Sequence, residues 1–322
     1  MILAIILFLI GFILITKGAD IFIECTVEIG KKTGISKLIL GATIVSFATT
    51  LPELTVSVFA SIDNHTTMSL GNAVGSIICN TGLILGLVAL ISPFKVDKKM
   101  FFSKSVILLI CVFTLMILGI DGKISQRDGL LLIVMLSIYM YSNIKSVYGN
   151  NKVGVSKNRK VDDCSIESSK YGKLKISILF ILGLIMMVVG SKLLVDNGVI
   201  LASFIGIPQG VISLTVIALG TSLPELVSSL TAIRKKQHEI SVGNILGANI
   251  LNITSVIGIS SLINDLPILL HNIRIDFVFM IILLLTLILP TIRSRKIYRL
   301  QGFILLSTYI IYIITIYFIY LV

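Results

Sequence analysis

Charged side chains are scarce in this chain. They make up 13% of its 322 residues, whereas 56% of the residues are hydrophobic. Soluble domains carry about a quarter charged residues, so this chain lacks the polar surface that would keep a globule of its size in water. The sequence therefore predicts a polytopic membrane protein, which excludes cytosolic enzymes, secreted disulfide scaffolds and DNA-binding modules.

Cysteine and histidine are also few, and their positions argue against chemistry based on them. The four cysteines show no paired metal-ligand spacing, and the three histidines fall between apolar segments. No Gly-x-Ser-x-Gly motif is present. The net charge of +11 comes from short basic clusters between apolar runs, which is typical of membrane topology signals. We therefore expect no enzyme activity, no cofactor and no nucleic-acid partner.

Ten apolar segments are long enough to cross a bilayer, which takes about 20 residues. They cover roughly 2–29, 38–62, 68–92, 102–120, 125–145, 174–201, 210–233, 240–263, 275–292 and 300–321. The one long polar stretch, 146–173, is rich in Lys, Asn and Ser and is expected to be a flexible linker loop.

The two halves of the chain repeat each other at an offset of 172 positions. The clearest match pairs Leu51-Pro52-Glu53-Leu54 with Leu223-Pro224-Glu225-Leu226, and further matches extend over 41–86 and 213–258. Each half, 1–145 and 174–322, holds five of the expected helices. Because five is odd, the second half must enter the membrane upside down. The predicted fold is all-α, with ten transmembrane helices in two inverted five-helix repeats.

The distribution of basic residues sets the expected orientation. If the N-terminus lies outside, the loops on the inner side hold most of the 27 Lys and Arg residues, including Lys95, Lys98, Lys99 and Lys104. The outer side keeps only Lys123, Arg127, Lys192 and Arg274. This asymmetry agrees with the positive-inside rule. We therefore expect a multi-pass protein of the cell membrane with both termini outside and the 146–173 loop in the cytoplasm.

Glu53 and Glu225 are the only acidic residues deep within apolar segments. Each lies on a stripe of Ser and Thr residues that recur at spacings of three and four, and neither stripe contains Lys or Arg. An ionised carboxylate at that depth costs several kcal/mol unless it is compensated. The natural compensating charge is a cation from solution, and inverted repeats are typical of secondary transporters.

Pro52 and Pro224 supply further ligands. A proline inside a helix removes a hydrogen bond and opens the preceding turn, which frees backbone carbonyls at Ala48 and Gly220 and beside them. Two carboxylates and neutral oxygens suit calcium, which takes six to eight oxygen ligands. Asn80 and Asn252, which are also related by the offset, could each present an amide oxygen to the same cavity.

Each of these features can also be interpreted as purely structural, with no role in ion binding. Proline kinks and Ser/Thr stripes often only support helix packing, and the pairs Gly71/Gly75 and Gly243/Gly247 favour close packing over binding. A single buried glutamate can also be a protonated structural acid. The repetition of glutamate, proline and threonine in both halves favours ion binding over these readings.

The segments FATTLPELTVS with GNAVGSIICN, and ALGTSLPELVSS with GNILGANILN, resemble the paired alpha-repeats of the sodium/calcium exchanger family, within the cation/calcium exchanger superfamily. The resemblance implies ten helices in inverted halves and an antiporter in which the first and sixth helices slide as gates. It implies that calcium is held by Glu53, Glu225, Thr49 and Thr221. It implies sodium sites at Ser46, Thr50, Ser76, Ala218 (through its carbonyl) and Ser222, with Asn80 and Asn252 as central polar side chains.

Two residues depart from the family pattern. Ala248 stands where a serine is usual, so one hydroxyl ligand is missing, and the outer sodium site is expected either to be weaker or to be completed by water or Asn249. Asn252 is neutral where potassium-dependent relatives carry aspartate, which argues against potassium co-transport.

The sequence thus predicts an antiporter that exchanges Na⁺ for Ca²⁺. The alternative is a proton/calcium (or other cation) exchanger of the same superfamily, although those relatives usually carry an acid within the GN motif and this chain has Gly71-Asn72-Ala73-Val74. A passive cation channel is a second alternative. The expected partners are the two ions and the lipid bilayer. No obligate protein partner is inferred, which leaves a monomer as one option.

Overall fold

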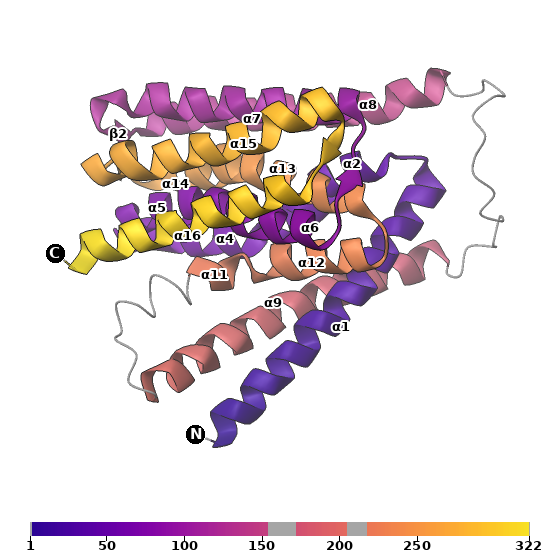
Figure 1. Cartoon of the computed structure of the whole chain (residues 1–322), viewed down its shortest axis with the longest axis horizontal. Helices are drawn as coiled ribbons and strands as arrows, with labels where there is room; N and C mark the ends of the chain where they lie inside the picture. The colour runs from indigo at the N-terminus through magenta and orange to yellow at the C-terminus, as the bar shows by residue number, and fades with distance from the viewer. Residues whose placement is uncertain (1, 154–171, 205–217, 322) are drawn as a thin grey trace.

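The computed structural model describes residues 2–153, 172–204 and 218–321, and nearly all of them are helical. Figure 1 shows long helices lying side by side, with α1 and α9 forming a separate inclined pair at one edge. The first half contains α1 (Ile2–Thr33), α2 (Lys37–Leu40), η1 (Gly41–Val45), α3 (Ser46–Thr49), α4 (Leu51–Ile62), α5 (Thr66–Ile78), η2 (Cys79–Ile84), α6 (Leu85–Ile91), α7 (Lys98–Leu118), η3 (Gly119–Asp121) and α8 (Gln126–Val153). The second half contains α9 (Lys173–Phe204), α11 (Ala218–Thr221), α12 (Leu223–Arg234), α13 (His238–Leu251), η5 (Asn252–Ile257), α14 (Gly258–Ile263), η6 (Asn272–Asp276), α15 (Phe277–Ser294) and α16 (Arg299–Leu321).

Seven helical segments in the described ranges are long and apolar enough to cross a membrane. An eighth is added if the pair Lys37–Thr49 and Leu51–Ile62, which is bent by 43°, counts as one span. Two expected spans are not among them. The segment 125–145 is helical as part of α8 but falls outside this count, and 210–233 is only partly within the described residues. This count therefore does not confirm ten spans. Helix α8 also runs to Val153, into the range expected as linker loop, and 154–171 lie outside the described residues.

The helix bend lies at the position that the proline predicts. Thr50 (φ −80°, ψ −4°) separates α3 from α4, and Pro52 follows in the first turn of α4. Ser222 (φ −89°, ψ 6°) and Pro224 repeat this arrangement between α11 and α12. The proline ring cannot continue the hydrogen-bonding pattern of the preceding turn. Each break places a glutamate, Glu53 or Glu225, in the first turn of the new helix.

Helices α1 and α9 pack backbone to backbone through four glycines. A Cβ atom added at Gly11 would lie 2.9 Å from the Gly190 carbonyl oxygen, and one added at Gly18 would lie 2.8 Å from that of Gly183. The repeat offset relates Gly11 to Gly183 and Gly18 to Gly190. Because only glycine permits this approach, the two inclined helices of Figure 1 form a closely packed antiparallel pair.

Two short β-ladders, which the sequence analysis did not predict, tie the halves together. Strand β1 (Phe94–Lys95) pairs with β4 (Lys296–Ile297), and β2 (Lys123–Ile124) pairs with β3 (Leu266–Pro267), both antiparallel. β1 and β3 are equivalent strands of the two repeats, and each of them pairs with a strand from the opposite half of the chain. Each ladder therefore crosses between the first and second halves.

Candidate ion-binding site

Glu53 and Glu225 lie in the interior of the protein. Both residues are 0% exposed to solvent, and their carboxyl groups are close enough to interact electrostatically. No ion pair in the described part of the chain includes either residue. The structure therefore brings together the two acids that the sequence analysis singled out, without a basic side chain between them.

Three of the four carboxyl oxygens have no hydrogen-bond partner among the described residues: Glu53 Oε2, Glu225 Oε1 and Glu225 Oε2. The fourth, Glu53 Oε1, accepts a bond of 3.4 Å from the Ser222 hydroxyl. Buried charges without partners are costly, by several kcal/mol each. Each glutamate does lie in the first turn of its helix, where the helix dipole favours negative charge. That effect is small beside the burial cost, so the arrangement is suited to a bound cation.

The threonine that precedes each helix break donates a hydrogen bond from its hydroxyl to a residue in the other half of the chain. Thr49 donates to Asn244 Oδ1 at 3.1 Å, and Thr221 donates to Asn72 Oδ1 at 3.3 Å. The two bonds join equivalent residues of the two repeats, which are related by the offset of 172 positions. Both threonines are oriented by these bonds, and because a hydroxyl that donates its hydrogen keeps its lone pairs, both the hydroxyl and the backbone carbonyl of each threonine remain possible ligands.

Asn72 and Asn244 were not among the site residues expected from the sequence. Asn72 also donates to the Ser57 hydroxyl at 2.9 Å and to the Glu53 carbonyl at 3.2 Å, and Asn244 donates to the Ser228 hydroxyl at 3.2 Å. Both asparagines hold the segments that carry the glutamates. Their signal in the sequence is the Gly-Asn pair that begins each second motif block at the same offset.

The residues expected at sodium sites fall into three groups. Ser76 and Ser222 lie together, with their hydroxyls 3.5 Å apart and Ser222 also bonded to Glu53. Thr50 is 3% exposed, and its hydroxyl forms no hydrogen bond with the described residues. Ser46 donates to the Thr43 carbonyl at 3.2 Å and is packed against Gly247.

Ala218 begins α11, directly after the range 205–217 that lies outside the described residues. The carbonyl of Gly220, one of those expected to be freed by proline, instead accepts a bond of 2.7 Å from the Ser191 hydroxyl on α9. The second half therefore offers one fewer free carbonyl than the sequence suggests.

Asn80 and Asn252 lie at matching positions in the π-helical segments η2 and η5, and both are 0% exposed. Asn80 Oδ1 and both amide atoms of Asn252 lack partners among the described residues. Asn249 accepts from Asn80 at 3.2 Å and donates to Thr81 at 2.9 Å. The amide of Asn249 is thus engaged, which disfavours it as the replacement ligand expected beside Ala248.

The donor set of this site is made of oxygens. No three His, Cys, Asp or Glu side chains converge on a metal position within the described ranges. The interior instead offers two carboxylates, hydroxyls, amides and carbonyls. Hard cations such as calcium and sodium prefer oxygen ligands, whereas zinc prefers nitrogen and sulfur.

Known proteins share this arrangement of sequence and fold. A family model described as "Sodium/calcium exchanger protein" matches residues 3–145 and 175–318. The chain belongs to the sodium/calcium exchanger family. It is accordingly a multi-pass membrane protein from a family of cation exchangers, not of enzymes.

Two relatives and one solved structure illustrate the similarity. An uncharacterized membrane protein of Methanocaldococcus jannaschii is 36% identical and aligns over 94% of this chain and 95% of its own length. The sodium/calcium exchanger MaX1 of Methanosarcina acetivorans is 28% identical over 97% of both chains. The structure of the sodium-calcium exchanger NCX_Mj soaked without Na⁺ and Ca²⁺ superposes with a TM-score of 0.83 at 36% identity. That superposition covers 98% of this chain and 99% of the other.

Proposed function

We propose that the protein is a secondary active antiporter that exchanges Na⁺ for Ca²⁺ by alternating access, with the two ions competing for Glu53 and Glu225. The observation that carries this proposal is the pair of buried, interacting carboxyl groups with three oxygens left without partners. Family membership and the relative named as a sodium/calcium exchanger support it.

Competition for one charged site explains exchange. Two bare carboxylates are expensive to carry through a bilayer, so the empty site resists switching between the two faces. Either one Ca²⁺ or sodium ions neutralise the charge and permit the switch. Coupling then follows from electrostatics and does not require a separate gate for each ion.

The ligand assignment follows the geometry of the two breaks. In this proposal calcium takes the Glu53 and Glu225 carboxylates and the carbonyls of Thr49 and Thr221, whose hydroxyls are held by asparagines. Sodium takes positions around this centre, and Asn80 and Asn252 face the central space. The proposed sodium ligands are Ser46, Thr50, Ser76, Ala218 and Ser222.

The proposed architecture is two inverted five-helix repeats, 1–145 and 174–322, joined by a cytoplasmic linker, with both termini outside. Several reciprocal features support the inversion. The β-ladders exchange partners between halves. Asn64 (φ 62°) and Lys236 (φ 57°), related by the offset, both adopt left-handed backbone after a membrane helix. Such matched strain at matched positions is expected when two halves share one fold.

Proton coupling is the alternative mechanism at the same site. Adjoining buried carboxyl groups can be neutralised by protons as well as by sodium. The two mechanisms differ in the driving ion, which makes them separable by experiment.

The test is calcium uptake into proteoliposomes driven by an outward sodium gradient at equal pH, with Glu53→Gln and Glu225→Gln compared with the unmodified protein. We expect uptake that depends on the sodium gradient and is lost in both variants. Unchanged uptake in both variants would refute the site assignment. Uptake driven by a pH gradient without sodium would replace sodium coupling with proton coupling.

A further inference from the structure

Charged side chains hold α1 of the first half against the end of α12 in the second half. Lys235 Nζ lies 2.6 Å from Glu24 Oε1 and 3.9 Å from Asp20 Oδ1, and Arg234 also pairs with Asp20. Lys235 donates a further bond of 3.2 Å to the Asp20 carbonyl. On the proposed topology these contacts lie toward the cytoplasmic side. They close the inner end of the boundary between the two halves.

The repeat offset relates this inner cluster to four residues near the opposite end of the molecule. Asp20, Glu24, Arg234 and Lys235 correspond, in this order, to Lys192, Asp196, Ile62 and Asp63. The inner pair of Lys235 with Asp20 therefore has Asp63 and Lys192 as its counterpart. The base and the acid have exchanged positions, so the two residues still attract each other.

Asp63 and Lys192 are not paired in this structure. Both side chains are exposed, and no ion pair in the described part of the chain includes either of them. Helix α1 packs along α12, whereas no comparable packing joins α9 to α4 within the described ranges. Figure 1 shows α9 diverging from the central helices toward its C-terminal end. The inner contact is thus formed, and its outer counterpart is not.

The position of Lys192 gives a second reason to expect a partner. It lies within Leu174–Gly198, a segment that is long and apolar enough to cross the membrane. Ionisable residues inside such segments are rare, costly and usually paired. A partner that Lys192 meets in only part of the transport cycle would reduce this cost. By the repeat symmetry, that partner is Asp63, which caps the outer end of α4.

Alternating access supplies the movement that brings the two residues together. Two inverted repeats of one fold can exchange conformations when one repeat rocks against the other. In the exchanged state α9 approaches the end of α4, as α1 now lies along α12. We propose that Asp63 and Lys192 are positioning residues for transport, which pair in the inward-open state and close the outer end of the boundary. This inference rests on the proposed exchange by alternating access.

The outer contact is weaker than the inner one. At the inner end Lys235 attracts both Asp20 and Glu24, and Arg234 adds a third ion pair. At the outer end Asp196 has the same sign of charge as Asp63, and Ile62 adds no charge. The charges therefore favour the state that is closed at its inner end and make the inward-open state the minor one. Calcium affinity at the inner face is then lowered by the small fraction of protein in that state.

The first test is a disulfide between the two positions in the full-length protein, with its native cysteines kept. Asp63→Cys with Lys192→Cys should cross-link in proteoliposomes on oxidation with copper phenanthroline, as identified by mass spectrometry of the linked peptides. The cross-link should stop calcium uptake until a reductant restores it. Asp63→Cys with Ile185→Cys is the control. Ile185 is also exposed but lies seven residues, about 10 Å, before Lys192 on α9, so this pair should not cross-link.

The second test measures the half-saturating calcium concentration at the cytoplasmic face, in inside-out membrane vesicles loaded with sodium. An exposed ion pair changes an equilibrium by up to about fivefold. Asp63→Asn and Lys192→Gln each remove the attraction, so this concentration should rise by up to about fivefold. Asp196→Asn removes the repulsion, so the concentration should fall. Asp63→Asn combined with Lys192→Gln should shift it no further than either change alone, because both remove one interaction.

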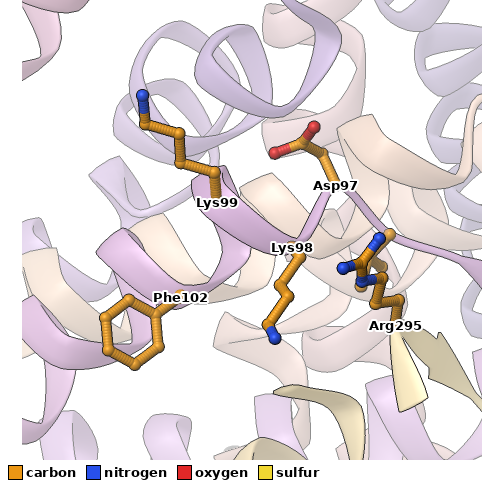
Figure 2. Close-up of a pocket in the computed structure, with 6 residues that line it drawn as sticks. Asp97, Lys98, Lys99, Phe102 and Arg295 are labelled. Atoms are coloured by element: carbon orange, nitrogen blue, oxygen red, sulfur yellow. The ribbon is translucent and has the colours of Figure 1, made fainter. Parts of the chain in front are cut away.

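Lys99→Gln is the control for a general effect of charge at the inner face. Lys99 borders a pocket there, and no ion pair in the described residues includes it. Figure 2 shows its side chain extending away from Arg295. This variant should keep the half-saturating calcium concentration of the unmodified protein. Shifts of the same sign in Lys192→Gln and Asp196→Asn would overturn the proposal, because a pair with Asp63 requires opposite signs.

Failure of this inference differs from failure of the proposed function. Absence of sodium-driven calcium uptake in the unmodified protein would refute the proposed function, whatever the cross-link shows. If the unmodified protein exchanges the two ions, two results overturn this inference alone. One is cross-linking of the Lys192 pair no greater than that of the Ile185 pair. The other is an unchanged half-saturating calcium concentration in all three charge variants.

Discussion

The Thr49 hydroxyl donates a hydrogen bond of 3.1 Å to the Asn244 side chain, from α3 in the first half to α13 in the second. The bond from Thr221 to Asn72 is its counterpart at the repeat offset. Each half therefore positions the threonine of the other, directly before the break that carries a glutamate. A disturbance on one side of the site should be felt on the other.

The first prediction concerns this reciprocal pair. Asn244→Ala removes the shorter of the two hydrogen bonds of the buried Thr49 hydroxyl and leaves the bond of 3.4 Å to the Ser46 carbonyl, at a cost of about 1 kcal/mol. We expect the calcium concentration for half-maximal uptake to rise about five- to tenfold. Thr49→Val, which keeps the backbone carbonyl, should have an effect of similar size or smaller.

Combining Thr49→Val with Asn244→Ala tests the pair directly. If the bond is the reason for both effects, the double variant should differ little from Asn244→Ala alone. The coupling energy should then be at least about 0.5 kcal/mol, as for contacting residues. Effects that simply add would contradict a shared interaction.

The second prediction concerns the glycine contact between α1 and α9. Gly18→Ala places a methyl group 2.8 Å from the Gly183 carbonyl, so the helices must separate or shift. Overpacking of this kind costs typically about 1–3 kcal/mol. We expect lower thermal stability and slower exchange at saturating calcium, with calcium affinity less affected because the glutamates lie on other helices.

The control for this contact is Ile13→Ala on the same helix. Ile13 is 57% exposed and lies away from the glycine contact. It should retain the exchange rate of the unmodified protein. If Gly18→Ala exchanges at the normal rate, movement of α1 against α9 is not limited by this contact.

The third prediction concerns the ion pairs that join α1 to the end of α12. Lys235 Nζ lies 2.6 Å from Glu24 Oε1, and Arg234 pairs with Asp20. These side chains are partly exposed, so each pair contributes roughly 0.2–1 kcal/mol. If α1 moves relative to α12 during transport, Lys235→Gln should shift the balance of states and change the apparent calcium affinity by at most about fivefold.

A charge exchange provides the decisive comparison for these pairs. Glu24→Lys combined with Lys235→Glu should restore part of the affinity that either single change alters, because the new glutamate at position 235 also faces Asp20, which lies 3.9 Å from Lys235 Nζ in the unmodified protein. Lys236→Gln, which removes a neighbouring charge that forms no ion pair in the described residues, should behave like the unmodified protein. Failure of the exchange to restore affinity would assign the effect to something other than this pairing.

The sequence predicted those parts of the site that depend on local chemistry and on repetition. Glu53 and Glu225 were identifiable because acids inside apolar segments are costly and because each recurs with a proline at one offset. The same proline predicted the helix break, which the structure shows at Thr50 and Ser222. The family followed from the same motifs.

Features that depend on contacts between distant segments were not predictable in this way. The acceptor of the Thr49 hydroxyl lies in the other half of the chain, and no spacing rule connects them. The β-ladders are too short to produce an alternating pattern. Lys104 was counted with a cytoplasmic loop, but it is 4% exposed within α7, bonded to Asn143 and placed 5.0 Å from the centre of the Tyr139 ring.

The fourth prediction follows from Tyr139, a buried residue of α8 whose hydroxyl donates to the Ala42 carbonyl. Ala42 belongs to the π-helical segment η1, where the Ser46 N–H bonds to the Gly41 and Thr43 carbonyls. Tyr139 therefore gives the Ala42 carbonyl a donor from another helix, beside the irregular turn of η1. The wider turn of η1 leads directly into Ser46, a proposed sodium ligand.

Tyr139→Phe removes this buried hydrogen bond to the Ala42 carbonyl, which costs about 1 kcal/mol. We expect a lower melting temperature and a two- to tenfold rise, by order of magnitude, in the sodium concentration that half-inhibits calcium uptake. Tyr141→Phe on the same helix is the matched control, because Tyr141 is 66% exposed and should change neither quantity. A Tyr139→Phe protein with lowered stability but unchanged sodium dependence would show that η1 is held by Tyr139 without shaping the sodium site, since a purely structural loss lowers the melting temperature alone.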